Sequence, residues 1–212
     1  MNQQGSAEWI QERLGRFTAS EIHKLIPQGK GGQPFSDTGK TYILEKLVEL
    51  ETGFPASEIY GPAVEWGSDK EPMARDWYTR ITGNVVQEAY FEPYGTHAGG
   101  SPDGLVGELG IIEIKCPFKT VNHFKYRMAR KADDLPAEYF WQIQMNLLCT
   151  GRSWCDFVSF DPRVRTKELG IFILRVSAAK AEQELLKSRI ADAVLLLNQY
   201  REQVAPVEIV RL

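Results

Sequence analysis

Two carboxylates and a lysine in the middle of the chain have the types and spacing needed for metal-assisted chemistry. Nine residues separate Asp103 from Glu113, and Lys115 follows Glu113 after one residue. The surrounding isoleucines predict a strand, in which positions 113 and 115 point to the same face. Mg²⁺ binds carboxylate oxygens together with water and phosphate oxygens. Such a metal would polarise a phosphate ester and activate a water that Lys115 orients. The pattern therefore predicts phosphodiester hydrolysis.

The same spacing also has an ordinary structural explanation. A half-buried strand alternates apolar and charged residues, so Glu113 and Lys115 would then simply face solvent. Asp103 precedes Gly104, and aspartate before glycine is typical of turns. Spacing alone leaves both interpretations open, and the surrounding sequence has to decide between them.

Several motifs surround this pattern in a fixed order. They are Trp9, Arg13, Gly15 and Thr18-Ala19-Ser20; Trp66-Gly67 with Glu71; SPDG at 101–104 with EIKCPF at 113–118; Gln142 and Gln144; and Asp161-Pro162-Arg163. Together they resemble the lambda-type (YqaJ-type) phage alkaline exonucleases of the PD-(D/E)XK nuclease superfamily. The resemblance covers residues 9–165 and is far more specific than any one motif.

The resemblance implies a role for each matching residue of the metal site. Asp103 and Glu113 would hold two Mg²⁺ ions, with Mn²⁺ as a substitute, and the carbonyl oxygen of Ile114 would be a further ligand. Lys115 would position the attacking water.

Two further residues are implied at the same site. Glu71 would sit near a second metal through water, and Gln142 would support the lysine or the water network. Pro72 departs from the family pattern, because a proline pushes the preceding residue out of the α region. It puts the position of Glu71 in doubt.

The N-terminal block is similar to the family's pocket for the 5′-phosphate of a DNA end, which implies phosphate binding by Arg13, Thr18 and Ser20. Free N–H groups at a helix start attract anions, and arginine can bind a phosphate with two hydrogen bonds. The alternative is that Thr18 and Ser20 only cap a helix while Arg13 is solvated.

A local basic segment follows the candidate catalytic strand and contains no acidic residue before Asp133. His123, Phe124 and Tyr126 are interleaved with its cations. Such a segment could bind the DNA backbone; a solvated helix face or a subunit contact is the alternative. The cations are Lys119, Lys125, Arg127, Arg130 and Lys131.

The family resemblance implies a Mg²⁺-dependent exonuclease acting on ends of linear double-stranded DNA. It implies degradation of the 5′-terminated strand in the 5′ to 3′ direction to mononucleotides, leaving a 3′ single-stranded tail for recombination. A ring-shaped homotrimer and a single-strand annealing recombinase as partner are implied as well. The alternatives are a PD-(D/E)XK endonuclease and a non-catalytic module that binds DNA ends.

Composition excludes several other classes of protein. With 43% hydrophobic and 25% charged residues, the 212-residue chain is not typical of disordered, collagen-like or coiled-coil proteins. No apolar run approaches the roughly 18 residues of a membrane span, and the N-terminus does not resemble a secretory signal. We therefore expect a cytoplasmic protein without a membrane partner. The three cysteines share no C-x-x-C spacing and are expected to be reduced thiols.

Periodicity and turn residues predict the elements that position these groups. They indicate one α/β domain over residues 1–212, with a central mixed β-sheet flanked by helices and, from the resemblance, a restriction-endonuclease-like core. A capping box at 18–21 predicts a helix start at Thr18 or Ser20. The final helix carries an apolar stripe of Ala181, Leu185, Ala193, Leu196 and Tyr200. The expected helices are 18–27, 38–53, 62–81, 136–149 and 178–203; the expected strands are 85–94, 98–106 broken at 101–104, 110–115, 154–160 and 171–176; and 28–37 is expected to be a mobile loop.

Overall fold

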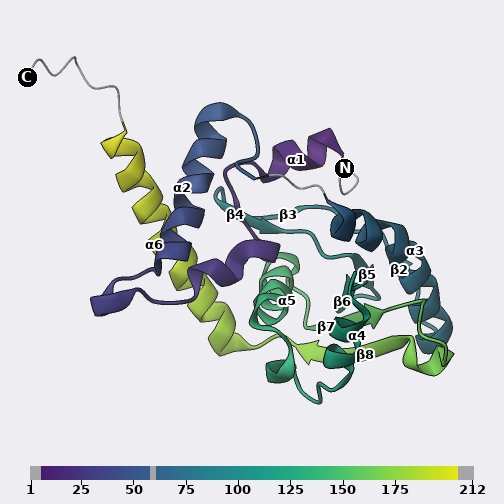
Figure 1. Cartoon of the computed structure of the whole chain (residues 1–212). Helices are drawn as coiled ribbons and strands as arrows, with labels where there is room; N and C mark the ends of the chain where they lie inside the picture. Colours follow the sequence, from purple (N-terminus) through teal and green to yellow (C-terminus); the bar gives the residue numbers. More distant parts are fainter. Residues whose placement is uncertain (1–5, 58–60, 205–212) are drawn as a thin grey trace, which may run out of the picture.

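The computed structural model describes residues 6–57 and 61–204 and contains two β-sheets flanked by helices (Figure 1). The larger sheet has the order β2-β5-β6-β7-β8, in which β6 and β7 are parallel and the other pairs antiparallel. This mixed sheet confirms the predicted fold class. Its strands are β2 (Val86–Gln87), β5 (Gly104–Val106), β6 (Gly110–Lys115), β7 (Trp154–Phe160) and β8 (Ile171–Ser177).

The smaller sheet has the order β1-β4-β3 and was not predicted as a separate layer. The predicted strand 85–94 divides into β2 and β3, which belong to different sheets, and the 98–106 segment divides into β4 and β5 in the same way. Between β2 and β5 the chain therefore crosses twice from one sheet to the other. The strands are β1 (Phe17–Thr18), β3 (Glu92–Tyr94) and β4 (Ala98–Gly100).

Helices cover both sheets, and their bounds agree with most of the sequence predictions. Figure 1 shows α6 beside α2 at one end of the molecule and α3 beside the larger sheet at the other. The α-helices are α1 (Ala7–Arg13), α2 (Asp37–Thr52), α3 (Pro62–Thr82), α4 (Thr120–Arg127), α5 (Ala137–Thr150) and α6 (Lys180–Gln203). The 3₁₀ segments are η1 (Ala19–Leu25), η2 (Lys30–Gly32), η3 (Ala132–Asp134) and η4 (Lys167–Leu169).

Strand β6 is buried on both faces because each face meets its own apolar cluster. Ile111 packs with Ile143 of α5 and Phe157 of β7. Ile112 and Ile114 pack on the other face, in the cluster that includes residues of α3. Ile111 therefore shares the face of Glu113 and Lys115, and only Ile112 and Ile114 lie on the opposite face.

The segment after Arg13 differs from its prediction. Thr18 ends β1, and the helix that follows is a seven-residue 3₁₀ segment with no side-chain cap. The backbone N–H of Thr18 donates instead to the hydroxyl of Tyr42 at 3.0 Å. The helix therefore starts next to Thr18, as predicted, but the capping box does not form, because the hydroxyl of Tyr42 on α2 accepts the backbone N–H that a capping glutamate would have bound.

Helix α3 continues through Pro72 as one element, Pro62–Thr82, although a proline tends to start or kink a helix. Glu71 consequently keeps a helical backbone. Ala74 and Tyr78, after the proline, are fully buried against the larger sheet. Their packing stabilises a helix that the missing backbone N–H of Pro72 weakens locally.

Helix α6 buries a different stripe from the one expected. Leu186, Ile190, Ala193 and Leu197 are buried, whereas Leu185 is 42% exposed. Ala181 is exposed, and Leu196 and Tyr200 are half-buried. The sequence alone allows several apolar faces on this helix, and packing against α2 and α5 selects one.

Arg189 of α6 holds the end of the 28–37 segment against the core. Its guanidinium donates to the carbonyls of Leu25 and Pro34 and stacks 4.2 Å over the buried ring of Phe35. These contacts fix a segment that its composition predicted to be a mobile loop.

Two remaining predictions concern the chain as a whole. The three cysteines are free thiols, as expected; Cys155 is buried and the other two are half-buried. In the described part of the chain, no helix is long and apolar enough to cross a membrane. The prediction of one domain over residues 1–212 also includes residues outside the described ranges and stays a prediction.

Candidate functional site

The turn before β5 brings Asp103 next to Glu113 and Lys115 of β6. Strand β5 pairs with β6 so that Gly104 faces Ile112, and the backbone N–H of Asp103 donates to the carbonyl of Ile112 at 3.1 Å. The Asp103 carboxylate in turn accepts the backbone N–H of Ile114 at 2.6 Å. Nine residues of separation in sequence thus become a direct contact across one hairpin.

Glu113 and Lys115 form an ion pair on this face. Lys115 Nζ lies 2.7 Å from Glu113 Oε1 and donates to Gln142 Oε1 of α5 at 3.1 Å. Glu113 is 0% exposed. The alternative in which Glu113 is an ordinary solvent-facing strand residue is therefore wrong.

A cavity of about 520 Å³ joins these residues to the N-terminal block. Asp103, Glu113, Lys115 and Gln142 line it, with Ile114. Glu71 lines the same cavity from α3 and pairs with Arg75 at 2.8 Å. The departure at Pro72 therefore does not remove Glu71 from the site.

Burial dominates the electrostatics of the site. It raises the pKa of Asp103 well above the usual value, and the charges of Glu113 and Glu71 add to the effect. It raises the pKa of Glu113 as well, against the opposing charge of Lys115. Burial alone would lower the pKa of Lys115, but the carboxylates of Glu113 and Asp103 reverse this, and the net shift is upward. The charge of Lys115 thus offsets only part of the effect of burial on the two carboxylates.

A divalent cation fits this donor set. Two buried carboxylates with raised pKa values would gain from a bound cation, and Mg²⁺ takes one or two protein carboxylates while keeping several waters. Within residues 6–57 and 61–204, no group of three or more histidine, cysteine, aspartate and glutamate side chains is arranged to hold a metal ion. Direct binding would rest on Asp103 and Glu113, and the expected contribution of Glu71 through water stays a prediction.

Arg13 lies on the wall of the same cavity, surrounded by hydroxyl groups. It donates to Ser20 Oγ and to Ser101 Oγ, both at 3.4 Å, and its guanidinium stacks 4.0 Å from the ring of Trp9. Burial lowers its pKa to about 10, so it remains cationic at neutral pH. A cation with hydroxyl donors on either side is suited to a terminal phosphate.

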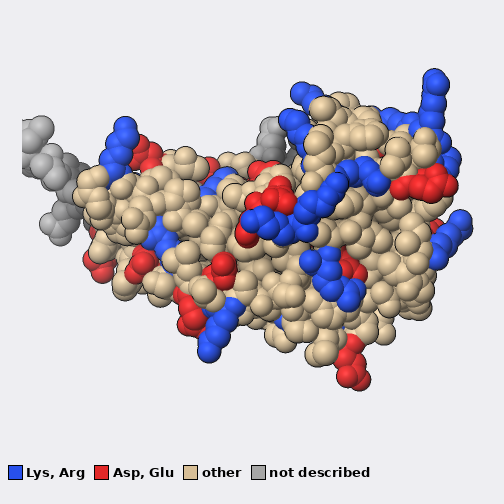
Figure 2. Space-filling view, turned by 90° about the horizontal axis from the view of Figure 1, so that it is seen from below, with Lys and Arg blue, Asp and Glu red and all other residues tan. Residues whose placement is uncertain are grey.

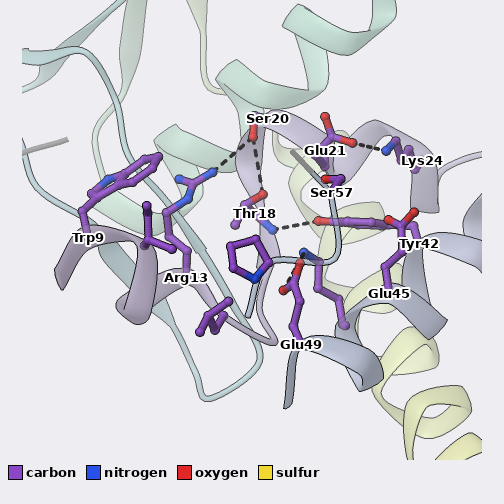
Figure 3. A pocket seen from close by; sticks show the side chains of 14 residues that line it. Trp9, Arg13, Thr18, Ser20, Glu21, Lys24, Tyr42, Glu45, Glu49 and Ser57 are labelled. Carbon is purple, nitrogen blue, oxygen red and sulfur yellow. Dashed lines mark hydrogen bonds and ion pairs between the residues drawn. The ribbon is translucent and has the colours of Figure 1, made fainter. Parts of the chain in front are cut away.

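Thr18 does not line the cavity that contains the carboxylates. Figure 3 shows a second cavity, of about 370 Å³, with Arg13, Thr18 and Ser20 on one side and Tyr42 and Glu49 on the other. Thr18 Oγ1 lies 3.4 Å from Ser20 Oγ. The structure therefore brings Arg13 and Ser20 to the carboxylate site, while Thr18 only supports Ser20.

Two residues of the site were missed by the sequence analysis. Ser101 accepts hydrogen bonds from Arg13 and from Trp9 Nε1 at 3.2 Å. Asn146 Nδ2 donates to Glu113 Oε2 at 3.0 Å. Ser101 belongs to the SPDG motif, and Asn146 follows Gln142 by one helical turn, so both signals were present in the sequence.

The five cations after β6 differ in how far protein groups engage them. Lys119 and Lys125 are exposed, and Lys119 borders a further cavity of about 410 Å³ that Lys115 also lines. The other three have protein partners: Arg127 donates to the carbonyl of Ile171, Arg130 to that of Arg127, and Lys131 pairs with Asp133.

Of the aromatic residues among these cations, His123 and Tyr126 are buried and Phe124 is 40% exposed. Figure 2 views the molecule from below, the side on which α4 lies in Figure 1, and shows basic and acidic side chains next to one another.

Asp161 and Arg163 support the strand end that carries Lys115. Arg163 bonds both carboxylate oxygens of the buried Asp161 at 2.8 Å and donates to the carbonyls of Pro117 and Phe118. Its guanidinium also lies 4.2 Å from the ring of Trp66. Three sequence motifs that are far apart in the chain are thus joined by one arginine.

A mixed sheet that carries a turn aspartate beside a Glu-x-Lys strand defines the PD-(D/E)XK class of fold. The family model described as "YqaJ-like viral recombinase domain" matches residues 8–153, more than half of the chain. The protein belongs to this family, which confirms the resemblance seen in the sequence.

Solved structures agree with this assignment. The alkaline exonuclease LHK-Exo from Laribacter hongkongensis is 30% identical, with a TM-score of 0.81 over 94% of this chain and 96% of that one. Its complex with dAMP is 32% identical, with a TM-score of 0.82 over the same shares. A phage-related exonuclease from Haemophilus somnus 129PT, 16% identical over 90% of this chain and 96% of that one, shares the fold with a TM-score of 0.77. No curated protein matches the chain.

Proposed function

We propose that the protein is a Mg²⁺-dependent exonuclease that degrades the 5′-terminated strand of linear double-stranded DNA in the 5′ to 3′ direction. One observation carries this proposal: Asp103, Glu113 and Lys115 share a single cavity with Arg13 and Ser20. The residues that would act on the reacting phosphodiester and those that would bind a terminal phosphate therefore line the same cavity. Similarity to the alkaline exonuclease LHK-Exo supports the reaction class.

Asp103 and Glu113 would hold Mg²⁺, with the carbonyl of Ile114 as a further ligand and Glu71 acting through water. Two ions would bind, and Mn²⁺ would substitute for Mg²⁺. Bound there, the metal would polarise the scissile phosphate and lower the pKa of a coordinated water.

Lys115 would orient the attacking water and offset negative charge as it develops on the phosphate. Its ammonium is held between Glu113 and Gln142, so it points along one direction into the cavity. Gln142 accepts a hydrogen bond from the Lys115 ammonium and so occupies one of the three N–H donors of that ammonium. Glu113 occupies a second donor, and these two contacts set the direction of the third.

Arg13 and Ser20 would bind the 5′-phosphate of the DNA end, with Ser101 completing the set of hydroxyl donors and Thr18 behind Ser20. Because the phosphate site and the carboxylates line the same cavity, the first nucleotide of the strand would lie between them and leave as a mononucleotide. The structural match to an exonuclease in complex with dAMP supports this product.

The remaining strand would become a 3′ single-stranded tail for recombination by strand annealing. Lys119 and Lys125 would contact the DNA backbone, with Arg127, Arg130 and Lys131 contributing less because protein groups already engage them. A ring-shaped homotrimer and a single-strand annealing recombinase as partner complete the proposal. The family's description as a viral recombinase domain supports the recombination role.

The test is digestion of a linear duplex that carries a 5′-phosphate on one strand only. The phosphorylated strand should shorten from its 5′ end in Mg²⁺ and release mononucleotides. EDTA and the substitution Asp103→Asn, which keeps the side-chain shape, should each abolish the reaction. Arg80→Ala, an exposed arginine on α3 that lines neither cavity, is the control and should digest like the unmodified protein.

The alternatives predict other products. Covalently closed circular DNA should stay intact with an exonuclease, and internal cuts in it would move the assignment to an endonuclease. If the protein binds DNA ends but does not cleave them with any divalent metal, the assignment would move to a non-catalytic module that binds DNA ends.

A further inference from the structure

Helix α5 holds both partners of the Glu113–Lys115 pair through two amides placed one turn apart. Gln142 accepts from Lys115 Nζ at 3.1 Å, and Asn146 Nδ2 donates to Glu113 Oε2 at 3.0 Å. Lys115 occupies the other oxygen, Glu113 Oε1, at 2.7 Å. Both oxygens of Glu113 are therefore tied to a fixed donor.

We propose that Asn146 is a positioning residue that sets the orientation of the Glu113 carboxylate for metal binding. The proposal rests on the function proposed above and deepens it. Asn146 does not line the cavity of about 520 Å³, so it acts through Glu113 and touches neither metal nor DNA.

Burial makes the contact between these two side chains decisive. Glu113 and Asn146 are each 0% exposed, so bulk water does not compete for the carboxylate or replace the amide. A carboxylate in such surroundings depends on the few donors that the fold provides. Removing the amide would leave Glu113 Oε2 without that donor. The Glu113 carboxylate could then turn about the terminal torsion of its side chain.

The amide is costly where it stands, which argues against a purely structural role. Asn146 Oδ1 is buried and has no hydrogen-bond partner among the residues that the structure describes. A buried polar atom without a partner destabilises the fold. Asn146 itself is 0% exposed, so solvent does not relieve this cost. The contact with Glu113 is what the asparagine provides.

A glycine of the smaller sheet leaves the space that the amide needs. A Cβ atom on Gly100 of β4 would lie 2.3 Å from Asn146 Oδ1 and 3.3 Å from the Cβ of Ala19. Gly100 therefore allows β4 to lie directly against the amide. Gly100→Ala offers a second route to the same effect, because it would displace Asn146 without removing the amide group.

The test compares metal binding, stability and cleavage in Asn146→Leu and Gly100→Ala. Mn²⁺ binding is followed by titration calorimetry without DNA, and cleavage by single-turnover digestion at saturating DNA. Both variants should bind Mn²⁺ about 10-fold more weakly or worse, the usual effect of losing a group that orients a metal ligand. The cleavage rate should fall to a similar extent while KM for DNA stays unchanged. Asn146→Leu should also melt at a lower temperature, because the buried Glu113 Oε2 loses its donor, so the comparison of Mn²⁺ affinity with a control of similar stability loss decides the role of Asn146.

Gln144→Leu is the matched control. Gln144 is a buried amide on the same helix, but it bonds the carbonyl of Ser177 and the N–H of Ala179, away from the carboxylates. This variant should lose stability and keep wild-type Mn²⁺ affinity.

The outcomes separate this proposal from the proposed function. A wild-type protein that binds Mn²⁺ and cuts DNA, together with an Asn146→Leu variant of equal Mn²⁺ affinity, would overturn only the role of Asn146. Equal losses of affinity in Asn146→Leu and Gln144→Leu would also overturn it, because the effect would then come from general damage to α5. A wild-type protein that binds no Mn²⁺ would overturn both proposals.

Discussion

The guanidinium of Arg13 and the hydroxyl of Ser101 meet at 3.4 Å although 88 positions separate them in the chain. Ser101 stands two residues before Asp103, so this contact ties the end of α1 to the turn that carries a candidate metal ligand. A phosphate bound at Arg13 would therefore be held in fixed relation to the carboxylates. Under the proposed function, this link would let one cavity both bind a DNA end and place the next phosphodiester for cleavage.

Replacing Arg13 should remove the preference for phosphorylated ends. Arg13→Lys keeps the charge but loses the two-pronged hydrogen bonding of a guanidinium. We expect initiation on 5′-phosphorylated duplex to slow by about 10- to 100-fold, the equivalent of one or two charged hydrogen bonds, while initiation on 5′-hydroxyl duplex changes little. Initial rates on the two duplexes measure this directly. An equal loss on both would show that Arg13 supports the fold and does not read the phosphate.

Lys115 should matter for chemistry more than for metal binding. Lys115→Met keeps a long side chain and removes the ammonium, so the single-turnover rate should fall by about 10²- to 10⁴-fold, the range for a residue that assists proton transfer. Mn²⁺ affinity should stay the same or rise, because a positive charge next to Glu113 is gone. Calorimetry and rapid quench on one preparation test both parts. Abolished Mn²⁺ binding would contradict this division of roles.

Arg163 should be a stability residue with an indirect effect on cleavage. Arg163→Ala would leave the buried carboxylate of Asp161 without its two-bond partner and release the carbonyls of Pro117 and Phe118. We expect the free energy of unfolding to fall by about 2 kcal/mol, which is typical of lost hydrogen bonds to a charged group. Urea denaturation measures the loss, and Arg165→Ala serves as the exposed control. The idea fails if both variants unfold at the same urea concentration.

His123 should make the fold sensitive to mild acid. Burial lowers its pKa below the ordinary value of 6.5, although the carbonyl of Leu169 opposes the shift. Its ring lies 2.8 Å from both Ser159 Oγ and the Leu169 carbonyl, an arrangement that suits the neutral form. The unfolded chain therefore takes up a proton at higher pH than the folded chain, and stability falls as pH drops below about 6.5.

Thermal unfolding between pH 7.5 and pH 5 tests this effect. His123→Asn should be less stable at pH 7.5 but show a shallower decline toward pH 5. His97→Asn, at a half-buried position outside the apolar clusters, is the comparison variant and should decline like the wild type. If the stability of all three proteins fell in parallel toward pH 5, His123 would be excluded as the source of the acid sensitivity.

Lys119 and Lys125 should set much of the salt dependence of DNA binding. Each phosphate contact contributes about 0.9 to the slope of log affinity against log salt concentration. The double variant Lys119→Ala, Lys125→Ala should lower that slope by about 2. Replacing Lys131, which already has Asp133 as a partner, should lower the slope less. Fluorescence anisotropy at several salt concentrations gives the slopes, and an unchanged slope would remove both lysines from the DNA surface.

The sequence by itself determined the chemistry and most of the local structure. Strand β7 and helices α3 and α5 lie within a residue or two of their predicted bounds, because periodicity, capping glycines and flanking prolines are local signals. Asp103, Glu113 and Lys115 could be selected because a hairpin brings them together over a short separation. The family resemblance then supplied the roles of Arg13, Glu71 and Gln142.

Only the tertiary structure decided which distant groups meet. The division of the strands into two sheets, the buried stripe of α6 and the uninterrupted course of α3 through Pro72 depend on packing energies that no local pattern contains. The same holds for the contacts of Ser101 with Arg13 and of Asn146 with Glu113. Their side chains are ordinary polar residues in sequence, and they acquire a role because burial excludes water and leaves a single partner within reach.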